Sequence, residues 1–292
     1  MPWLQLKINT ASENVDALSS LLMDLGALSV TYEDAQDQPL FEPPPGETPI
    51  WSETIITGLF ESNIDIDGTT DQIHQQFRDK ISAVRSEILE DKDWVREWMD
   101  RYQPMQFGKQ LWIVPSHHTP PEPQAVNILL DPGLAFGTGT HPTTAMCLEW
   151  LAEHPPVNQL VIDYGCGSGI LAIAAAKLGA SHVEAIDNDP QALLATRNNA
   201  KSNQVDQYIE CKGVNTALST CDTLLANILA GPLIELAKRF SEFTRPGANI
   251  VLSGILREQA EDVLKAYHPW FNIALTKERE DWVLLTGHRN TQ

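Results

Sequence analysis

The sequence is poor in cysteines and in basic residues, and it lacks a long apolar run. Its four cysteines are too few and too scattered for a disulfide framework or a paired-cysteine zinc site, and we expect no metal. The longest apolar run, residues 170–176, is seven residues long, well short of the roughly 18 that a membrane span needs. Residues 1–7 lack a basic region followed by an apolar core. We therefore expect a cytoplasmic protein without a membrane partner.

Basic residues are outnumbered along the whole chain. The 20 lysines and arginines face 39 aspartates and glutamates, a formal net charge of −19. Residues 1–120 hold 20 acidic and 8 basic residues (net −12), and residues 121–292 hold 19 and 12 (net −7). Because no dense Lys/Arg cluster occurs, we expect no direct nucleic-acid binding. Either the acidity only maintains solubility, or the acidic first part meets a basic macromolecule.

The length of 292 residues and a hydrophobic share of 42% predict two globular domains. Residues 1–90 repeat a strand–helix–strand order, which predicts a small α+β domain of ferredoxin-like arrangement. In chain order we expect a strand, a helix, two strands, a helix and a short final strand, at residues 4–8, 13–25, 27–32, 54–60, 70–81 and just beyond 81.

Residues 91–120 are predicted to form a helical and extended linker. Trp94 and Trp98 are four residues apart, so a helix places both on one face. Strands follow at 111–114 and 126–130, and we interpret His117 and His118 in the proline-rich loop between them as solvent-exposed.

From residue 121 to 292, strand and helix patterns alternate, which predicts an α/β domain with a mainly parallel sheet. The strands are expected at 160–164, 182–187, 208–211, 223–227 and 249–253, and the helices at 170–178, 190–202, 232–240 and 258–267. Segments 273–276 and 282–286 flank a charged turn and predict an antiparallel hairpin. That ending departs from the usual dinucleotide dehydrogenase fold.

A buried strand runs into a glycine-rich turn at residues 161–171. Asp163, Gly165, Gly167 and Gly169 stand in an Asp-x-Gly-x-Gly-x-Gly pattern, and glycines let a ligand approach the backbone closely. A dinucleotide fingerprint needs Gly or Ala at the position of Ile170. The pattern instead resembles the first motif of Rossmann-like S-adenosylmethionine methyltransferases.

Asp187 follows Gly165 by 22 residues, at the end of the next predicted strand. A carboxylate there can accept two hydrogen bonds from a ribose diol. Asp189 is the rival, but it precedes Pro190 and is better suited to cap the following helix.

Asn227 ends the fourth strand of the predicted parallel sheet and should face the same crevice as Gly165. Methyltransferases that act on adenine or on glutamine amides often carry two prolines and an aromatic residue after this position, whereas Ile228, Leu229 and Ala230 follow here. The sequence therefore favours a flexible, non-planar amine as the acceptor.

A second glycine-rich loop, residues 131–144, leads into another helix. Thr144 lies in the first turn, where hydroxyl and free N–H groups can hold a polar ligand. His141 can serve either as a general base or, more commonly for such a position, as a helix-start hydrogen-bonding residue.

Together, the loop 133–144, the glycine motif 165–169, Asp187 and the segment 227–232 resemble the bacterial ribosomal protein L11 methyltransferase family. The opening residues 1–6 and the segment 91–98 also match, so the likeness spans nearly the whole chain. The resemblance implies a substrate-recognition domain (1–90), a linker (91–120) and a class I methyltransferase domain (121–292). It also implies methyl transfer to lysine ε-amines and the N-terminal α-amine of that ribosomal protein. Carried over by position, the S-adenosylmethionine contacts are Thr144, Gly165, Asp187 and Asn227.

Asn227 is also the candidate catalytic residue, because its side-chain carbonyl can align the reacting amine. The sequence identifies no general base. Other readings stay open: a methyltransferase for rRNA or another nucleic acid, one for a small molecule or another protein, and a non-catalytic cofactor-binding adaptor.

Overall fold

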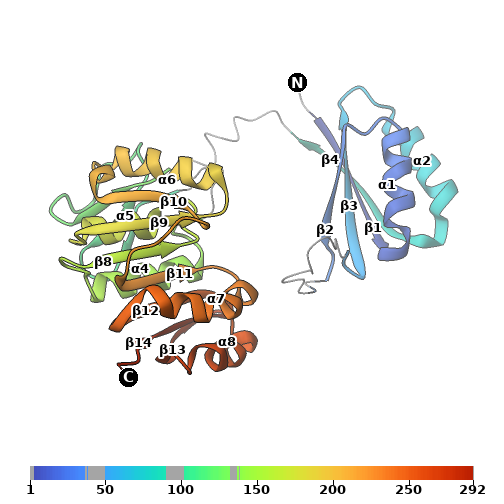
Figure 1. The fold of residues 1–292 in the computed structure, drawn as a ribbon. Helices are drawn as coiled ribbons and strands as arrows, with labels where there is room; N and C mark the ends of the chain where they lie inside the picture. Colours follow the sequence, from blue (N-terminus) through green and yellow to red (C-terminus); the bar gives the residue numbers. More distant parts are fainter. Residues whose placement is uncertain are drawn as a thin grey trace. The chain divides into compact units, whose positions relative to one another are not determined.

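The computed structural model describes residues 3–36, 38, 50–89, 102–131, 137 and 139–291. The chain divides into two compact units, residues 1–97 and 98–292, each with its own sheet and core (Figure 1). The predicted linker helix around Trp94 and Trp98 lies outside the described residues. Among the described helices, none is long and apolar enough to cross a membrane.

The first unit is a four-stranded antiparallel sheet with two helices on one face (Figure 1). The strand order is β2-β3-β1-β4, the ferredoxin-like arrangement that the sequence predicts. Its elements are β1 (Trp3–Ala11), α1 (Val15–Asp24), β2 (Ser29–Asp34), β3 (Glu53–Glu61), α2 (Ile66–Phe77) and β4 (Ile81–Leu89). Alternate residues of β1 and β3 face the helices and are fully buried, among them Leu6, Ile8, Ile56 and Phe60. The opposite face of the sheet carries no helix of this unit (Figure 1).

The end of the first unit differs from the prediction. Helix α2 begins at Ile66 rather than residue 70, because the Asp65 side chain accepts a hydrogen bond from the Gly68 N–H at 3.1 Å and caps it. The helix also ends at Phe77, so Ile81 opens a strand instead of closing the helix. Strand β4 is nine residues long rather than short, since it pairs with β1 along its length.

The second unit has a seven-stranded sheet in the order β10-β9-β8-β11-β12-β14-β13. The first five strands of that order are parallel, and β14 pairs antiparallel with both β12 and β13. The strands are β8 (Leu160–Tyr164), β9 (His182–Asp187), β10 (Ile209–Gly213), β11 (Cys221–Asn227), β12 (Thr244–Leu256), β13 (Phe271–Arg279) and β14 (Trp282–Arg289). The helices are α4 (Pro142–Glu153), α5 (Ile170–Lys177), α6 (Pro190–Ser202), α7 (Ala230–Phe243) and α8 (Ala260–Tyr267). The predicted parallel sheet with a terminal hairpin is confirmed.

Two apolar layers cover the two faces of this sheet. One contains α4, α5 and side chains such as Val161, and the other contains α7, α8 and side chains such as Ile162. Because neighbouring strand residues point to opposite faces, the continuous apolar run of β8 serves both layers. Every residue of α5 from Ile170 to Ala176 is buried, which explains its uniformly apolar sequence.

The C-terminal strands are longer than the sequence pattern indicates. The predicted charged turn at 277–281 is mostly strand, and the tip is reduced to Glu280 and Asp281. Glu280 adopts the left-handed conformation (φ 55°) there. The charged residues Lys277 and Arg279 lie within the paired part of β13, so their charge does not indicate a loop.

A small sheet of β5 (Met105–Phe107), β6 (Leu111–Val114) and β7 (Val126–Leu129) packs beside α5. Leu111 and Ile113 are fully buried in the core of the second unit, so this part of the predicted linker belongs to that unit. The exposed pair predicted after β6 is confirmed for His117 only. The chain turns back at Pro115, and the Nε2 of His118 is buried without a hydrogen-bond partner.

Candidate active site

The glycine-rich loop joins β8 to α5 and lies against the end of β9. The N–H groups of Gly165 and Cys166 both donate to the Ile186 carbonyl, at 2.7 and 2.9 Å. Gly165 has φ +79°, and a Cβ added to it would lie 2.2 Å from the Cγ2 atom of Ile228. Only glycine therefore fits this position without displacing a neighbour. Gly169 has φ +80° and begins α5 without a side-chain cap.

Asp163 supplies the hydrogen bond that Gly169 cannot make. Its Oδ2 accepts from the Ala172 N–H at 3.0 Å, in the first turn of α5, and the residue is 1% exposed. Burial raises the pKa of Asp163 to about 7, and the nearby Asp187 carboxylate adds to that rise against the Ala172 hydrogen bond. The sequence pattern alone assigns Asp163 no role of its own. An acidic residue inside an apolar strand was the available signal.

Asp187 and Asp189 have different partners. One carboxylate oxygen of Asp187 accepts from the Gly167 N–H at 2.9 Å, and the other accepts from the Asp189 N–H at 3.0 Å. The Asp189 carboxylate accepts from the Gln191 N–H at 2.8 Å and caps α6, with Pro190 at the first helical position. The capping interpretation of Asp189 is confirmed. Each oxygen of Asp187 keeps a further lone pair for a ligand hydroxyl.

Asn227 and Thr144 lie in contact, although they are far apart in sequence. The Asn227 Nδ2 donates to the Thr144 hydroxyl at 3.2 Å. Thr144 is 1% exposed in the first turn of α4, whereas Asn227 ends β11 and is half-buried. The contact thus joins α4, the helix that follows the second glycine-rich loop, to the end of β11 in the parallel sheet.

His141 caps α4, as its helix-start interpretation predicts. Its Nδ1 lies 2.7 Å from the Thr143 hydroxyl and accepts from the Thr143 N–H at 3.4 Å. Burial holds the pKa of His141 below its ordinary value, against the attraction of Glu280. Its ring meets that of Trp282 edge-on, with centroids 4.9 Å apart. His141 and the tip of the β13–β14 hairpin therefore form one wall.

Two adjoining cavities open at the carboxyl ends of the parallel strands. The smaller, about 230 Å³, is lined mainly by the two glycine-rich segments and Thr144. The larger, about 640 Å³, is lined by His141, Trp282 and apolar side chains that include Leu229. The residues common to both are Gly165, Asp187, Asn188, Asn227 and Ile228.

The four residues predicted from the sequence thus converge on one place. Gly165, Asp187 and Asn227 line both cavities, and Thr144 lines the smaller one and contacts Asn227. Trp282 was missed, because it follows a charged hairpin tip and belongs to no motif. Val214 and Arg239, which also line the larger cavity, gave no sequence signal either.

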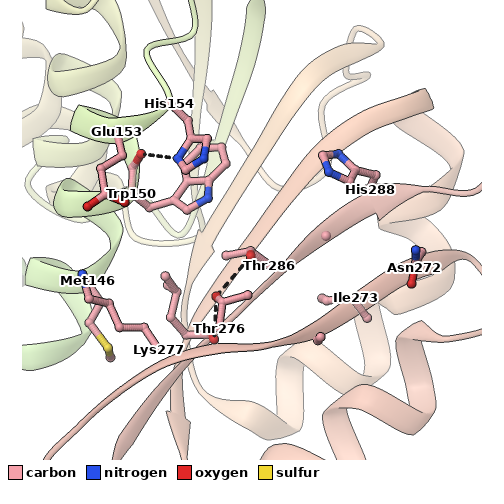
Figure 2. A pocket seen from close by; sticks show the side chains of 13 residues that line it. Met146, Trp150, Glu153, His154, Asn272, Ile273, Thr276, Lys277, Thr286 and His288 are labelled. Carbon is pink, nitrogen blue, oxygen red and sulfur yellow. Dashed lines mark hydrogen bonds between the residues drawn. The ribbon is translucent and has the colours of Figure 1, made fainter.

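A third cavity, of about 560 Å³, lies between α4 and the C-terminal hairpin and shares no lining residue with the other two. Figure 2 shows Trp150 and His154 pointing from α4 toward the strands, where Thr276 and Thr286 form a hydrogen bond. No predicted site residue lines it. A separate group of His182, Glu184 and Glu210 has metal-ligand chemistry, but Lys212 bonds both carboxylates, at 2.7 and 3.1 Å.

The strand order, the glycine-rich loop after β8 and the carboxylate ending β9 define a Rossmann-like class I methyltransferase. The chain matches the family model described as ribosomal protein L11 methyltransferase (PrmA) over residues 2–290. It is 53% identical to the ribosomal protein L11 methyltransferase of Marinobacter nauticus over 298 residues, with 99% of each chain covered. Against the Nitrosococcus oceani relative of the same name, identity is 50% over 291 residues, covering 99% of this chain and 100% of the relative.

A crystal structure of a ribosomal protein L11 methylase from Lactobacillus delbrueckii subsp. bulgaricus is 32% identical, with a TM-score of 0.59. It covers 65% of this chain and 100% of that one. The protein described here belongs to the ribosomal protein L11 methyltransferase family.

Proposed function

We propose that this protein transfers methyl groups from S-adenosylmethionine to lysine ε-amines and the N-terminal α-amine of ribosomal protein L11. The observation that carries the proposal is the position of Asn227. It lines both the glycine-lined cavity and the larger apolar one, so it lies where a methyl donor and an amine acceptor would meet. The names of the relatives support the protein acceptor over a nucleic acid.

The residues present suit S-adenosylmethionine. The smaller cavity is bordered by Gly137, Gly165 and Gly167, whose backbone leaves space beside polar N–H and C=O groups. Asp187 offers one free lone pair on each oxygen to a ribose diol, and the Thr144 hydroxyl borders the same cavity. When bound, the cofactor supplies a methyl group on a positively charged sulfur, which is electrophilic without a metal.

On the acceptor side, the protein must hold a neutral amine. The reference pKa of lysine is about 10.4, and an apolar environment lowers it by disfavouring the charged form. The side chains of Leu229, Leu236 and Trp282 provide such walls in the larger cavity. The Oδ1 atom of Asn227 can accept a hydrogen bond from the amine and so aim its lone pair.

This arrangement works mainly by proximity and orientation, because the electrophile is already activated. Asn227 is in turn oriented by its hydrogen bond to Thr144. His141 binds Thr143 and caps α4, so we assign it no proton-transfer role.

We further propose that the first unit recruits the ribosomal protein. It has a separate core, an excess of acidic residues and one sheet face without helices (Figure 1). A basic protein substrate would be attracted to this acidic unit, because complementary charge speeds encounter. This substrate also argues for a cytoplasmic enzyme.

The experiment is incubation of the full-length protein with methyl-labelled S-adenosylmethionine and undermethylated ribosomal protein L11, followed by mass spectrometry. We expect label on lysine side chains and the N-terminus of that protein. Isolated rRNA serves as the competing acceptor, and the Asn227→Ala variant as the matched control. Label on rRNA alone, or on no acceptor despite measurable cofactor binding, would overturn the proposal.

A further inference from the structure

Glu149 of α4 forms two ion pairs with the C-terminal hairpin. Its Oε2 accepts from the Lys277 Nζ at 2.5 Å, and its Oε1 accepts from the Arg279 Nη2 at 2.7 Å. The Glu149 side chain is 17% exposed. Burial opposes its ionisation, but the hydrogen bonds and charges of Lys277 and Arg279 outweigh burial and lower its pKa. A shielded carboxylate that binds two cations through separate oxygens is a stronger contact than a typical surface pair.

Both ends of this contact lead to the larger cavity of the active site. On α4, His141 is the N-cap of the same helix that carries Glu149. On the hairpin, Arg279 is the direct cross-strand partner of Trp282. Trp282 lines that cavity and meets the His141 ring edge-on at 4.9 Å. Arg279, which pairs with Glu149, is therefore directly opposite Trp282, and Trp282 in turn contacts His141.

A cavity interrupts the packing between α4 and the hairpin near the ion pairs. The cavity of about 560 Å³ separates the second half of α4 from β13 and β14 (Figure 2). The β13–β14 register shifts between Leu275 and Lys277, just before the ion pairs. Met146 of α4 and Leu284 of β14 belong to the same buried apolar cluster. The ion pairs of Glu149 add a polar connection between α4 and β13, towards the hairpin tip.

We propose that Glu149 is a positioning residue. By binding Lys277 and Arg279, it fixes Trp282 at the larger cavity. The inference rests on the proposed methyl transfer for its catalytic consequence, although the position of Trp282 can be measured without it. Removing the carboxylate abolishes the attraction between α4 and these two cations, so the hairpin tip is no longer held against α4. Trp282 then no longer holds a fixed position against the His141 ring.

The test compares Glu149→Gln with Glu153→Gln in the full-length protein. Glu153 lies one turn further along α4, is exposed and has no ion pair among the described residues. For Glu149→Gln we expect the kcat for methylation of ribosomal protein L11 to fall about 5- to 20-fold, a usual effect of misplacing a wall of the site. The Kd for S-adenosylmethionine should stay within about twofold. Glu153→Gln should leave both unchanged.

A second readout follows Trp282 directly. In protein labelled with fluorotryptophan, the Trp282 resonance is identified by its loss in Trp282→Phe. We expect one sharp resonance in the wild type and in Glu153→Gln, and a shifted or broadened one in Glu149→Gln. The double variant Lys277→Met, Arg279→Met removes the same contact from the other side and should move the resonance likewise.

An unchanged Trp282 resonance in Glu149→Gln and in the double variant would overturn the inference, whatever the activity. If the wild type itself transfers no methyl group to ribosomal protein L11, the proposed function fails, yet the resonance still decides the positioning role. If Glu149→Gln does not fold, the Trp282 resonance of the double variant alone tests the inference.

Discussion

Asn227 donates a hydrogen bond to Thr144 at 3.2 Å, across 83 positions of sequence. The bond commits the Nδ2 atom of the amide, and it leaves Oδ1 as the atom that can accept from an amine. Asn227 ends a parallel strand and Thr144 lies in the first turn of α4, so the contact depends on two segments that are distant in sequence. The position that we propose for the reacting amine is therefore built by the tertiary structure and by no single motif.

The Asn227–Thr144 pair should act as a unit in catalysis. We expect Asn227→Ala to lower kcat by about 10- to 100-fold, since it removes the group that aligns the amine. Thr144→Val should lower kcat less, and the double variant should be no worse than Asn227→Ala alone. Steady-state kinetics with the protein substrate measure this cycle. A normal kcat with only a raised KM in Asn227→Ala would contradict the catalytic assignment.

Asp187 should determine cofactor affinity, and Asp189 should not. Asp187→Ala removes a carboxylate from both cavities, and we expect binding of S-adenosylmethionine to weaken by about 1–3 kcal/mol. Asp189→Ala removes the α6 cap, so we expect about 1 kcal/mol of lost stability with little change in affinity. Calorimetric titration and thermal unfolding separate the two effects. Greater loss of affinity in Asp189→Ala than in Asp187→Ala would reverse the assignment.

Gly165→Ala should impair the site through crowding as well as strain. The new Cβ would meet Ile228 Cγ2 at 2.2 Å, and φ +79° disfavours any L side chain. Gly26→Ala is the matched control, because Gly26 also has positive φ (+97°) but has no atom within 4 Å of an added Cβ. We expect both variants to lose about 1 kcal/mol from strain, and only Gly165→Ala to lose cofactor binding. Adding Ile228→Ala should restore part of that binding.

Asp163 should make stability depend on pH near neutrality. Burial disfavours the carboxylate and raises its folded-state pKa to about 7, from the 3.8 of an exposed aspartate. The contribution of Asp163 to the free energy of unfolding is therefore fully present below about pH 4, and it is lost as the pH rises through about 7. Asp163→Asn keeps an acceptor for the Ala172 N–H but does not titrate. We expect the free energy of unfolding of Asp163→Asn, measured relative to that of the wild type, to rise by up to about 4 kcal/mol between pH 4 and 8.

Denaturant unfolding at several pH values measures this difference. A constant gap between the wild type and Asp163→Asn over that range would show that Asp163 is ionised in the folded protein at all of them.

The recruiting role of the first unit predicts a separation of binding from turnover. A fragment of residues 98–292 should bind S-adenosylmethionine, since all the cavity residues lie within it, yet scarcely methylate the ribosomal protein. Raised salt should slow methylation by the full chain chiefly through KM, because ions screen charges beyond about 8 Å at physiological strength. Circular dichroism checks the folding of the fragment. Equal efficiency of a folded fragment and the whole chain would exclude a recruiting role.

The parts of the site that are local in sequence were predictable, and the parts that depend on assembly were not. Gly165 and Asp187 follow strands with clear apolar patterns, so their convergence follows from parallel strand order. Trp282 enters the cavity only because the hairpin folds beside β12 and its tip approaches α4. Lys277 and Arg279 were assigned to a turn for their charge, whereas each contributes an ion pair to Glu149 from within a strand.

The same reasoning explains the misplaced start of α2. Asp65 and Gly68 look like turn residues in sequence, but a cap places such residues at and inside the start of a helix. The length of β4 was underestimated because its exposed positions carry mixed polar residues. Pairing with the full length of β1 extends it, and pairing partners are not visible in a single segment.

The placement of β14 between β12 and β13 has a consequence for biosynthesis. β13 is translated before β14, yet it has no neighbour in the sheet until β14 has followed it out of the ribosome. The hairpin that carries Trp282 and the cations for Glu149 is thus completed late, after the glycine-rich loop and β11 can already have formed. Folding that proceeds in step with translation would therefore place Gly165, Asp187 and Asn227 first and Trp282 last.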